Sequence, residues 1–273
     1  MKKKFSFERL AASPYVVWSL LFIIAPLLFV AYFAFTDSDG GFSFQNIASL
    51  GAYSKTFVMS LGFSLIATTV CFLIGYPLAY CMARTSERTR SVLMILLMLP
   101  MWISLLIRTY SLMALLDNGG LISSFLVDHG FEKLNFIGTE AAVILGMIYD
   151  FLPYMVMPIY TSMTKLDNRY LEAAADLGCN GPKTLFRVIF PLTMPGVVSG
   201  ITMVFVPSIS TFYISQKLGG GCFDLIGDTI ERQFQNAVTY HTGAAVSLVM
   251  MILILLSLAI MNKFSDSGED IIV

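Results

Sequence analysis

The long uncharged stretches of this chain decide what it can fold into. Four intervals between charged residues contain no Asp, Glu, Lys or Arg, and each exceeds the about 20 residues that a helix needs to cross a bilayer. They run from Arg9 to Asp37, Lys55 to Arg84, Arg187 to Lys217 and Arg232 to Lys263. Such runs are too long and too uniformly apolar for barrel strands. We therefore predict an all-α membrane protein.

Two further apolar stretches are each interrupted by one charged residue. Ser91–Leu116 contains Arg108, and Ala141–Lys165 contains Asp150. We interpret them as two more spans, which gives six transmembrane helices. The composition agrees, because 56% of the 273 residues are hydrophobic and only 13% are charged. The net charge of −1 disfavours a nucleic-acid partner, and two histidines leave little room for a metal centre.

The basic residues predict the orientation, since Lys and Arg are retained on the cytoplasmic side. With the N-terminus inside, twelve of the 17 Lys and Arg residues are cytoplasmic and four are outside. The inside set is Lys2, Lys3, Lys4, Arg9, Arg84, Arg88, Arg90, Lys165, Arg169, Lys183, Arg187 and Lys263. The outside set is Lys55, Lys133, Lys217 and Arg232. We expect a multi-pass protein of the plasma membrane with both termini in the cytoplasm.

The loop 165–191, between the fourth and fifth spans, is predicted to form a helical elbow. Asp167 or Asn168 can cap a short helix that runs to about Leu177. Gly178 and the following glycine–proline pair end that helix before a second short one. We therefore expect two short helices at the inner surface of the membrane.

The first of these helices has a surface of small residues. Ala173, Ala174 and Ala175 would let another protein approach closely, and Glu172 offers a carboxylate at the edge. This pattern is typical of a docking surface. An amphipathic helix resting on lipid headgroups would show similar chemistry, so the local residues leave both interpretations open.

The same loop resembles the coupling-loop signature of ABC importer permeases. The matching residues are Glu172-Ala173-Ala174, Gly178 and Val188-Ile189-Phe190-Pro191. Val188 and Phe190 stand where the signature usually has Ile and Leu, and Ala175 stands where a basic residue is common. Over about residues 55–262 the chain is similar to the spermidine/putrescine permeases. That similarity is carried by Leu105–Tyr110, Ile148–Pro158, Phe190–Gly196 and Leu225–Ile230.

The resemblance implies the type I fold of binding-protein-dependent importers and a permease subunit that carries polyamines. Its implied partners are a second homologous permease, two cytoplasmic ABC ATPase subunits, an extracytoplasmic substrate-binding protein, the polyamine and membrane lipid. The ATPases would bind ATP and Mg²⁺, so no cofactor is expected in this chain, which has no G-x-x-x-x-G-K-[ST] loop. The elbow would dock on the ATPase. The docking residues would be Glu172, Ala173, Ala174, Asp176, Gly178, Arg187 and Pro191.

We accordingly divide the chain into three parts. Residues 1–54 hold a cytoplasmic segment, the first span and an outer loop. Residues 55–262 form the permease domain, and residues 263–273 form a cytoplasmic tail.

Arg108 and Asp150 are the charged residues well inside the spans, where charge is costly and often functional. At 1.5 Å per residue in straight helices, they lie about 26 Å and about 21 Å from the inner ends of their spans. They could therefore meet. One interpretation is an ion pair that holds the two spans together, and the other is a polar passage for a cationic amine.

Aromatic side chains near these charges could provide cation–π contacts for an amine. The candidates for the path are Trp102, Tyr110, Tyr149, Tyr154 and Tyr213, together with Arg108 and Asp150. Aromatic residues are also common at membrane interfaces and in packed bundles. Each ring therefore has an ordinary structural interpretation as well.

Two other hypotheses compete with a polyamine permease. The first is an ABC permease for another small solute, such as an anion or a metal ion. The second is an intramembrane enzyme, which needs a nucleophile with a base or a metal cluster. No H-E-x-x-H motif occurs, and Asp150 has no second carboxylate in the spans. We therefore expect no enzymatic activity in this chain.

Overall fold

The computed structural model describes residues 14–37, 40–129, 135–236 and 238–269. The predicted cytoplasmic segment before Pro14, the predicted outer Lys133 and the end of the predicted tail, 270–273, lie outside these residues. Within the described residues the chain is helical, and its one β-bridge joins Thr36 to Phe42. The chain divides into two compact units. The smaller takes residues up to Ser54 with Thr229–Leu253, and the larger takes Lys55–Asp228 with Ile254–Val273.

The smaller unit is built around the first apolar helix. A π-helical turn, Leu20–Ile24, continues into α2, Ala25–Ala34, and no residue in the most apolar window of this helix is buried. Its other elements are α3 (Gln45–Ala48), a 3₁₀ turn (Ser49–Tyr53) and parts of α14 (Ile226–Gln235) and α15 (Tyr240–Glu269). A small core forms where Ala34 meets Ala244 and Ala245.

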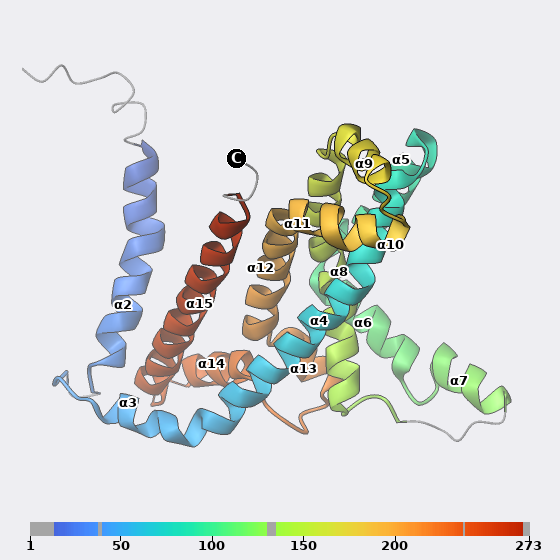
Figure 1. Ribbon diagram of the computed structural model, residues 1–273. Coiled ribbons are helices and arrows are strands. Elements are labelled where there is room, and N and C mark those ends of the chain that lie inside the picture. The colour runs from blue at the N-terminus through green and yellow to red at the C-terminus, as the bar shows by residue number, and fades with distance from the viewer. Residues whose placement is uncertain (1–13, 38–39, 130–134, 237, 270–273) are drawn as a thin grey trace, which may run out of the picture. The chain divides into compact units, whose positions relative to one another are not determined.

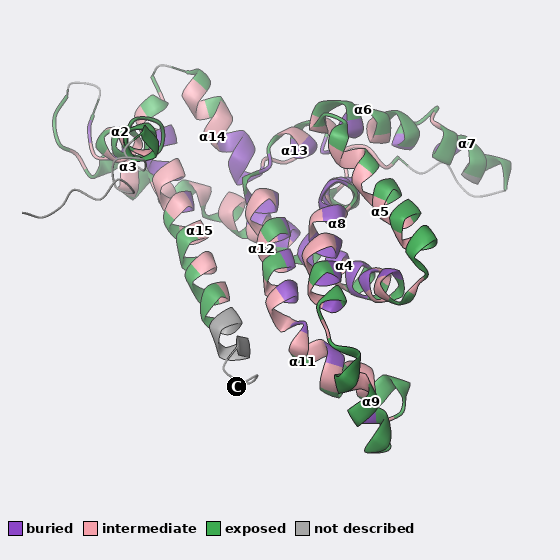
Figure 2. Ribbon diagram, turned by 90° about the horizontal axis from the view of Figure 1, so that it is seen from above, coloured by how far each residue is buried: buried purple, intermediate pink, exposed green. Residues whose placement is uncertain are grey.

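The larger unit contains the remaining helices (Figure 1). They are α4 (Ser54–Arg84), α5 (Glu87–Trp102), α6 (Leu105–Leu116), α7 (Leu121–Asp128), α8 (Glu140–Thr164), α9 (Asn168–Asp176), α10 (Gly181–Thr184), a π-helical turn (Leu185–Ile189), α11 (Phe190–Leu192), α12 (Met194–Ser210) and α13 (Tyr213–Leu218). Its buried residues concentrate on α4, α8 and α12 (Figure 2). In its most apolar segment, 56% of α8 is buried, whereas 33% of the corresponding segment is buried in the span that ends with α4. Helix α8 is therefore the central helix.

Glycines let α12 lie very close to α8. A Cβ at Gly196 would be 2.7 Å from the Pro158 carbonyl oxygen, and one at Gly200 would be 2.9 Å from the Met155 sulfur. Both distances are shorter than van der Waals contact, and at Gly196 the neighbour is backbone that cannot move aside, so glycine is required there. Small residues allow the same close approach of backbones in membrane helices generally. The two helices are therefore in close backbone contact.

Among the described residues the structure has four straight candidate spans, and it reaches the predicted six when each of two bent helix pairs is counted as one span. The four are single helices that are long and apolar enough to cross a membrane. The third span bends by 98° between α5 and α6, where Ile103 and Ser104 are extended. The fifth bends by 69° at Thr193, next to Pro195 in the first turn of α12. The straight helices assumed from the sequence are thus corrected for these two spans.

Candidate functional site

The elbow, residues 165–191, is shaped by local capping interactions. Asp167 caps α9 by accepting the Arg169 N–H at 3.0 Å, and Asn180 caps α10 by accepting the Lys183 N–H at 3.1 Å. Between them Gly178 adopts the left-handed region at φ +74°. These features confirm the two short helices expected from the sequence.

Gly178 makes the turn that ends α9. Its N–H donates to the Ala175 carbonyl at 2.9 Å, and the Cys179 N–H donates to the Ala174 carbonyl at 3.0 Å. This pair of bonds is a Schellman motif, which satisfies carbonyls left free at a helix C-terminus. Glycine serves at this position because a Cβ is strained at positive φ. A Cβ at Gly178 would meet no other atom within 4 Å, so backbone conformation alone requires glycine here.

The predicted docking residues do not all reach the surface. Glu172, Ala173 and Asp176 are exposed, as the prediction requires. Ala174 is only 5% exposed, so the uniform small-residue surface expected on α9 is corrected. Ala174 lies one helical turn after the half-buried Leu171, and this face of α9 packs inward.

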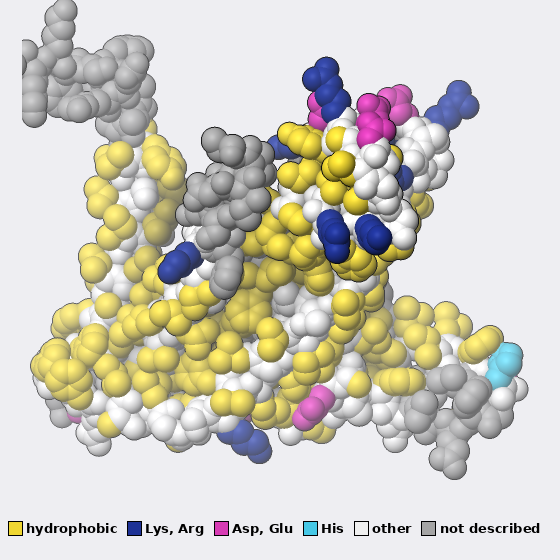
Figure 3. Space-filling model, viewed as in Figure 1, with side chains coloured by type: hydrophobic (Ala, Val, Ile, Leu, Met, Phe, Trp, Pro, Cys, Tyr) yellow, Lys and Arg dark blue, Asp and Glu magenta, His cyan; other side chains and the backbone are white. Residues whose placement is uncertain are grey.

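The second half of the elbow also carries exposed residues. Arg187 and Pro191 are exposed, and charged side chains gather over α9 and α10 in Figure 3. Sequence reasoning missed three large exposed side chains nearby, Tyr170, Leu177 and Phe186, of which Leu177 is 84% exposed. The apolar character of these three residues within an otherwise polar loop was the sequence signal that could have identified them. Exposed apolar side chains of this size suit contact with a partner protein or with lipid.

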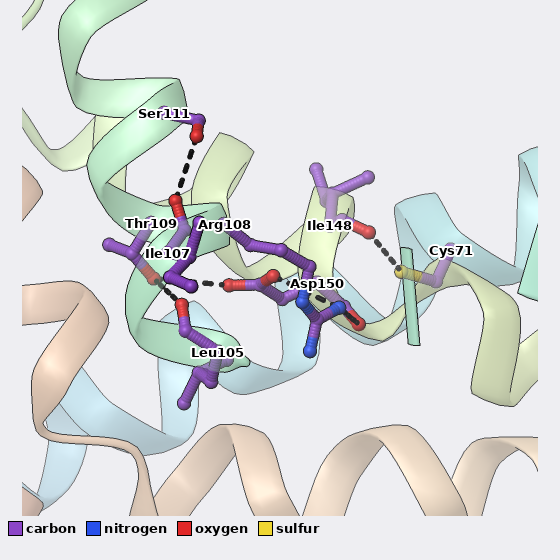
Figure 4. Close-up of polar contacts among 8 residues, drawn as sticks. All are labelled: Cys71, Leu105, Ile107, Arg108, Thr109, Ser111, Ile148 and Asp150. Atoms are coloured by element: carbon purple, nitrogen blue, oxygen red, sulfur yellow. Dashed lines mark hydrogen bonds and ion pairs between the residues drawn. The ribbon is translucent and has the colours of Figure 1, made fainter. Parts of the chain in front are cut away.

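Inside the larger unit Arg108 and Asp150 form an ion pair between α6 and α8 (Figure 4). The Arg108 Nη1 lies 3.2 Å from the Asp150 Oδ1, and it also donates to the Asp150 carbonyl at 3.2 Å. The Thr109 hydroxyl lies 3.5 Å from the Asp150 Oδ2. The side chains are 6% and 1% exposed. The two intramembrane charges therefore neutralise each other in the interior.

Arg108 and Asp150 come together through a bend, and not at similar depths on two straight helices as the sequence suggested. Arg108 lies on α6, beyond the 98° bend, so its distance along one straight span does not give its depth. The bend instead brings α6 alongside α8, where the Arg108–Asp150 contact forms.

The predicted aromatic residues form one pair rather than a continuous lining. Tyr110 and Tyr213 are in edge contact, with ring centroids 6.0 Å apart. The Lys217 Nζ lies 5.4 Å from the Tyr110 ring centroid and 5.8 Å from that of Tyr213. The two rings thus already hold an ammonium group, a contact that sequence reasoning missed because Lys217 was taken only as an outer basic residue.

The remaining predicted path residues lie elsewhere. Trp102 is 75% exposed and Tyr149 is 41% exposed, and neither makes a ring contact within the described part of the chain. Tyr154 is half-buried next to Phe151, with ring centroids 6.4 Å apart. No group of three His, Cys, Asp or Glu residues among those described could hold a metal ion.

Six apolar segments, a buried ion pair and an exposed elbow define a polytopic α-helical membrane protein. Residues 72–269 match the family described as the binding-protein-dependent transport system inner membrane component. The chain belongs to this family. It is therefore a membrane component of a transport system, with the fold of type I ABC importer permeases, and this family is not enzymatic. These findings confirm the predicted all-α fold, the family resemblance, the transport role and the membrane location.

Curated relatives match almost the whole chain. The spermidine/putrescine transport system permease protein PotB of Haemophilus influenzae is 36% identical over 260 residues, covering 92% of this chain and 91% of the relative. PotB of Salmonella typhimurium is 38% identical over 270 residues, covering 95% and 94%. A crystal structure of a bacterial ABC transporter that imports the acidic polysaccharide alginate has a TM-score of 0.76 at 17% identity, covering 93% of each chain. The likeness to that structure shows the fold alone.

Proposed function

We propose that this chain is the permease subunit of an ATP-driven importer of polyamines, with spermidine and putrescine as solutes. The observation that carries the proposal is the 36% and 38% identity to two relatives named as spermidine/putrescine permeases, over more than nine-tenths of the chain. The complex would contain a second homologous permease, two cytoplasmic ABC ATPases that bind ATP and Mg²⁺, and an extracytoplasmic binding protein.

Within this complex the elbow would dock on an ATPase. The exposed Glu172, Ala173 and Asp176 offer polar and small contacts, and the exposed Leu177 and Phe186 offer apolar ones. The elbow joins α8 directly to α11 and α12. Because α12 is packed on α8 through glycines, a push on the elbow would move both helices together. The movement of the ATPases as they close on ATP would in this way be transmitted to the membrane-spanning helices.

The translocation path is proposed to pass the Tyr110–Tyr213 pair. These rings hold the Lys217 ammonium, which is the same chemical group as the end of a polyamine. Asp150 would attract an amine only if its ion pair with Arg108 opened. We expect Asp150→Asn to lower uptake while the protein still inserts and assembles. Unchanged uptake kinetics would rule out a passage role for Asp150.

The test of the solute is ATP-dependent uptake by the complete reconstituted complex. We expect spermidine and putrescine to compete with each other and unrelated solutes not to compete. Uptake of an anion or metal ion that polyamines leave unaffected would overturn the polyamine assignment. The same vesicles without ATP provide the control for leakage.

The proposed orientation can be tested with two cysteines of the larger unit. Cys179 lies in the elbow and Cys222 follows α13, and both are free thiols. In variants that retain one of them, an impermeant thiol reagent applied to intact cells should label Cys222 and should label Cys179 only after permeabilisation. Labelling of Cys179 from outside would overturn the cytoplasmic position of the elbow.

A further inference from the structure

A polar cavity of about 210 Å³ lies at the root of the elbow. Its lining includes Arg84 at the end of α4, Arg90 in α5, and Thr164 and Asn168 on either side of the α8–α9 turn. The cavity is smaller than the about 300 Å³ at which sites for drug-sized ligands begin. Its size suits a small group, and its lining suits an anion.

The two arginines lack carboxylate partners. Within the described residues neither Arg84 nor Arg90 forms an ion pair with a carboxylate, in contrast to Arg108 with Asp150 and Arg169 with Asp167. No residue of the cavity lining is acidic. Two positive charges therefore face one small space without a negative charge to balance them.

The arginine side chains are nevertheless held in place. The Arg90 Nη2 donates to the Ala83 carbonyl at 3.1 Å and lies 3.5 Å from the Thr85 carbonyl. The Arg90 Nε is buried and has no hydrogen-bond acceptor among the described residues. The Arg84 Cζ lies 5.4 Å over the centre of the Tyr80 ring. Both guanidinium groups are therefore positioned at the cavity, where a bound anion would balance their charge.

The location indicates which anion is available. Arg84 is the last residue of α4 and Thr164 is the last residue of α8, and both helices are long and apolar enough to cross the membrane. The cavity therefore lies at the ends of two spans, where we expect the phosphates of a bilayer. Basic pockets between spans bind anionic headgroups at this depth, and the guanidinium fork matches phosphate oxygens.

We propose that this cavity binds a phosphate group through Arg84 and Arg90. The group belongs to a lipid headgroup or to free phosphate, and both present the same oxygens. Once bound beside Asn168, it would connect the α4–α5 turn to the first turn of α9. This site is independent of the solute that is transported.

The proposal is tested with the full-length chain purified in detergent, in wild-type form and as Arg84→Gln. Line broadening of the phosphorus NMR signal of inorganic phosphate measures the free-ion arm. Native mass spectrometry after extraction from phosphatidylcholine vesicles with and without phosphatidylglycerol measures the lipid arm. We expect Arg84→Gln to weaken phosphate binding or phosphatidylglycerol retention about tenfold, because one charge-assisted contact is lost.

Arg88→Gln is the matched control, since Arg88 is exposed on α5 and does not line the cavity. It should bind as the wild type does. A response to inorganic phosphate alone identifies a free-ion site, and retention of phosphatidylglycerol alone identifies a lipid site; either result supports the proposal. Equal losses in Arg84→Gln and Arg88→Gln, or no loss in Arg84→Gln, would overturn it.

Arg90→Lys provides a second variant should Arg84→Gln not fold. It keeps the positive charge but loses the planar fork, so binding should still weaken. Binding of Arg90→Lys equal to that of the wild type would also count against the site.

Discussion

Two ion pairs of the larger unit place the same chemistry in opposite surroundings. Asp167 and Arg169 lie 3.8 Å apart in the elbow, with side chains 55% and 89% exposed. Asp150 and Arg108 lie 3.2 Å apart between α8 and α6, with side chains 1% and 6% exposed. Exposed pairs contribute little to stability, whereas breaking a buried pair leaves an uncompensated charge. Burial rather than chemistry therefore separates a structural pair from a surface contact.

The largest expected effect comes from breaking the buried pair on one side. Arg108→Gln leaves the Asp150 carboxylate buried without a cation, so it should lower the free energy of unfolding by about 3–5 kcal/mol. The double variant Arg108→Gln/Asp150→Asn removes both charges and should lose less than the single change. Denaturant unfolding of the purified chain, analysed as a double-mutant cycle, measures the coupling. Losses that simply add would show that the two residues are not coupled.

A change at the exposed surface should affect coupling and leave stability alone. Glu172→Lys reverses a charge on the proposed docking face, and it should reduce ATP-driven uptake about tenfold with normal membrane insertion. The measurement pairs uptake with ATPase stimulation in the reconstituted complex. Glu87→Lys is the matched control, because Glu87 is exposed at the start of α5, outside the elbow. Normal uptake by Glu172→Lys would count heavily against docking at this residue.

Substitutions at Gly178 distinguish the effect of backbone strain from an effect on docking. Gly178→Ala should cost about 1 kcal/mol, because the alanine Cβ is strained at positive φ although the space around it is open. Gly178→Asn should cost less, since asparagine visits this region more readily. Gly178→Arg carries a similar backbone cost. A greater loss of uptake in Gly178→Arg than in Gly178→Ala would show that the bulky arginine interferes at the docking surface. Equal losses would show that backbone strain alone explains the effect.

The smallest effect is expected at the exposed pair. Arg169→Gln removes the partner of Asp167 and should change the free energy of unfolding by less than about 0.5 kcal/mol. Asp167→Ala should cost about 1 kcal/mol, because it also removes the cap of α9. Unfolding measured for both variants compares the ion pair with the cap. A loss in Arg169→Gln as large as in Arg108→Gln would contradict the comparison.

The elbow shows how far local sequence can predict structure. Asp167, Gly178 and Asn180 act on residues within four positions of themselves, so their roles follow from known helix capping. The orientation of Ala174 does not follow in this way. It depends on which face of α9 meets the rest of the unit, and three consecutive alanines carry no signal for that choice.

The long uncharged runs determined by themselves that this chain is a helical membrane protein, because a bilayer leaves a backbone few ways to satisfy its hydrogen bonds. The signature around Glu172 and Gly178 pointed to the family in the same direct way. Only the tertiary structure decided that the third span bends and that Arg108 then meets Asp150 from α6. It also decided that Arg84 and Arg90 share one cavity. Contacts between distant residues depend on how helices pack in three dimensions, and neither apolar length nor local capping encodes that packing.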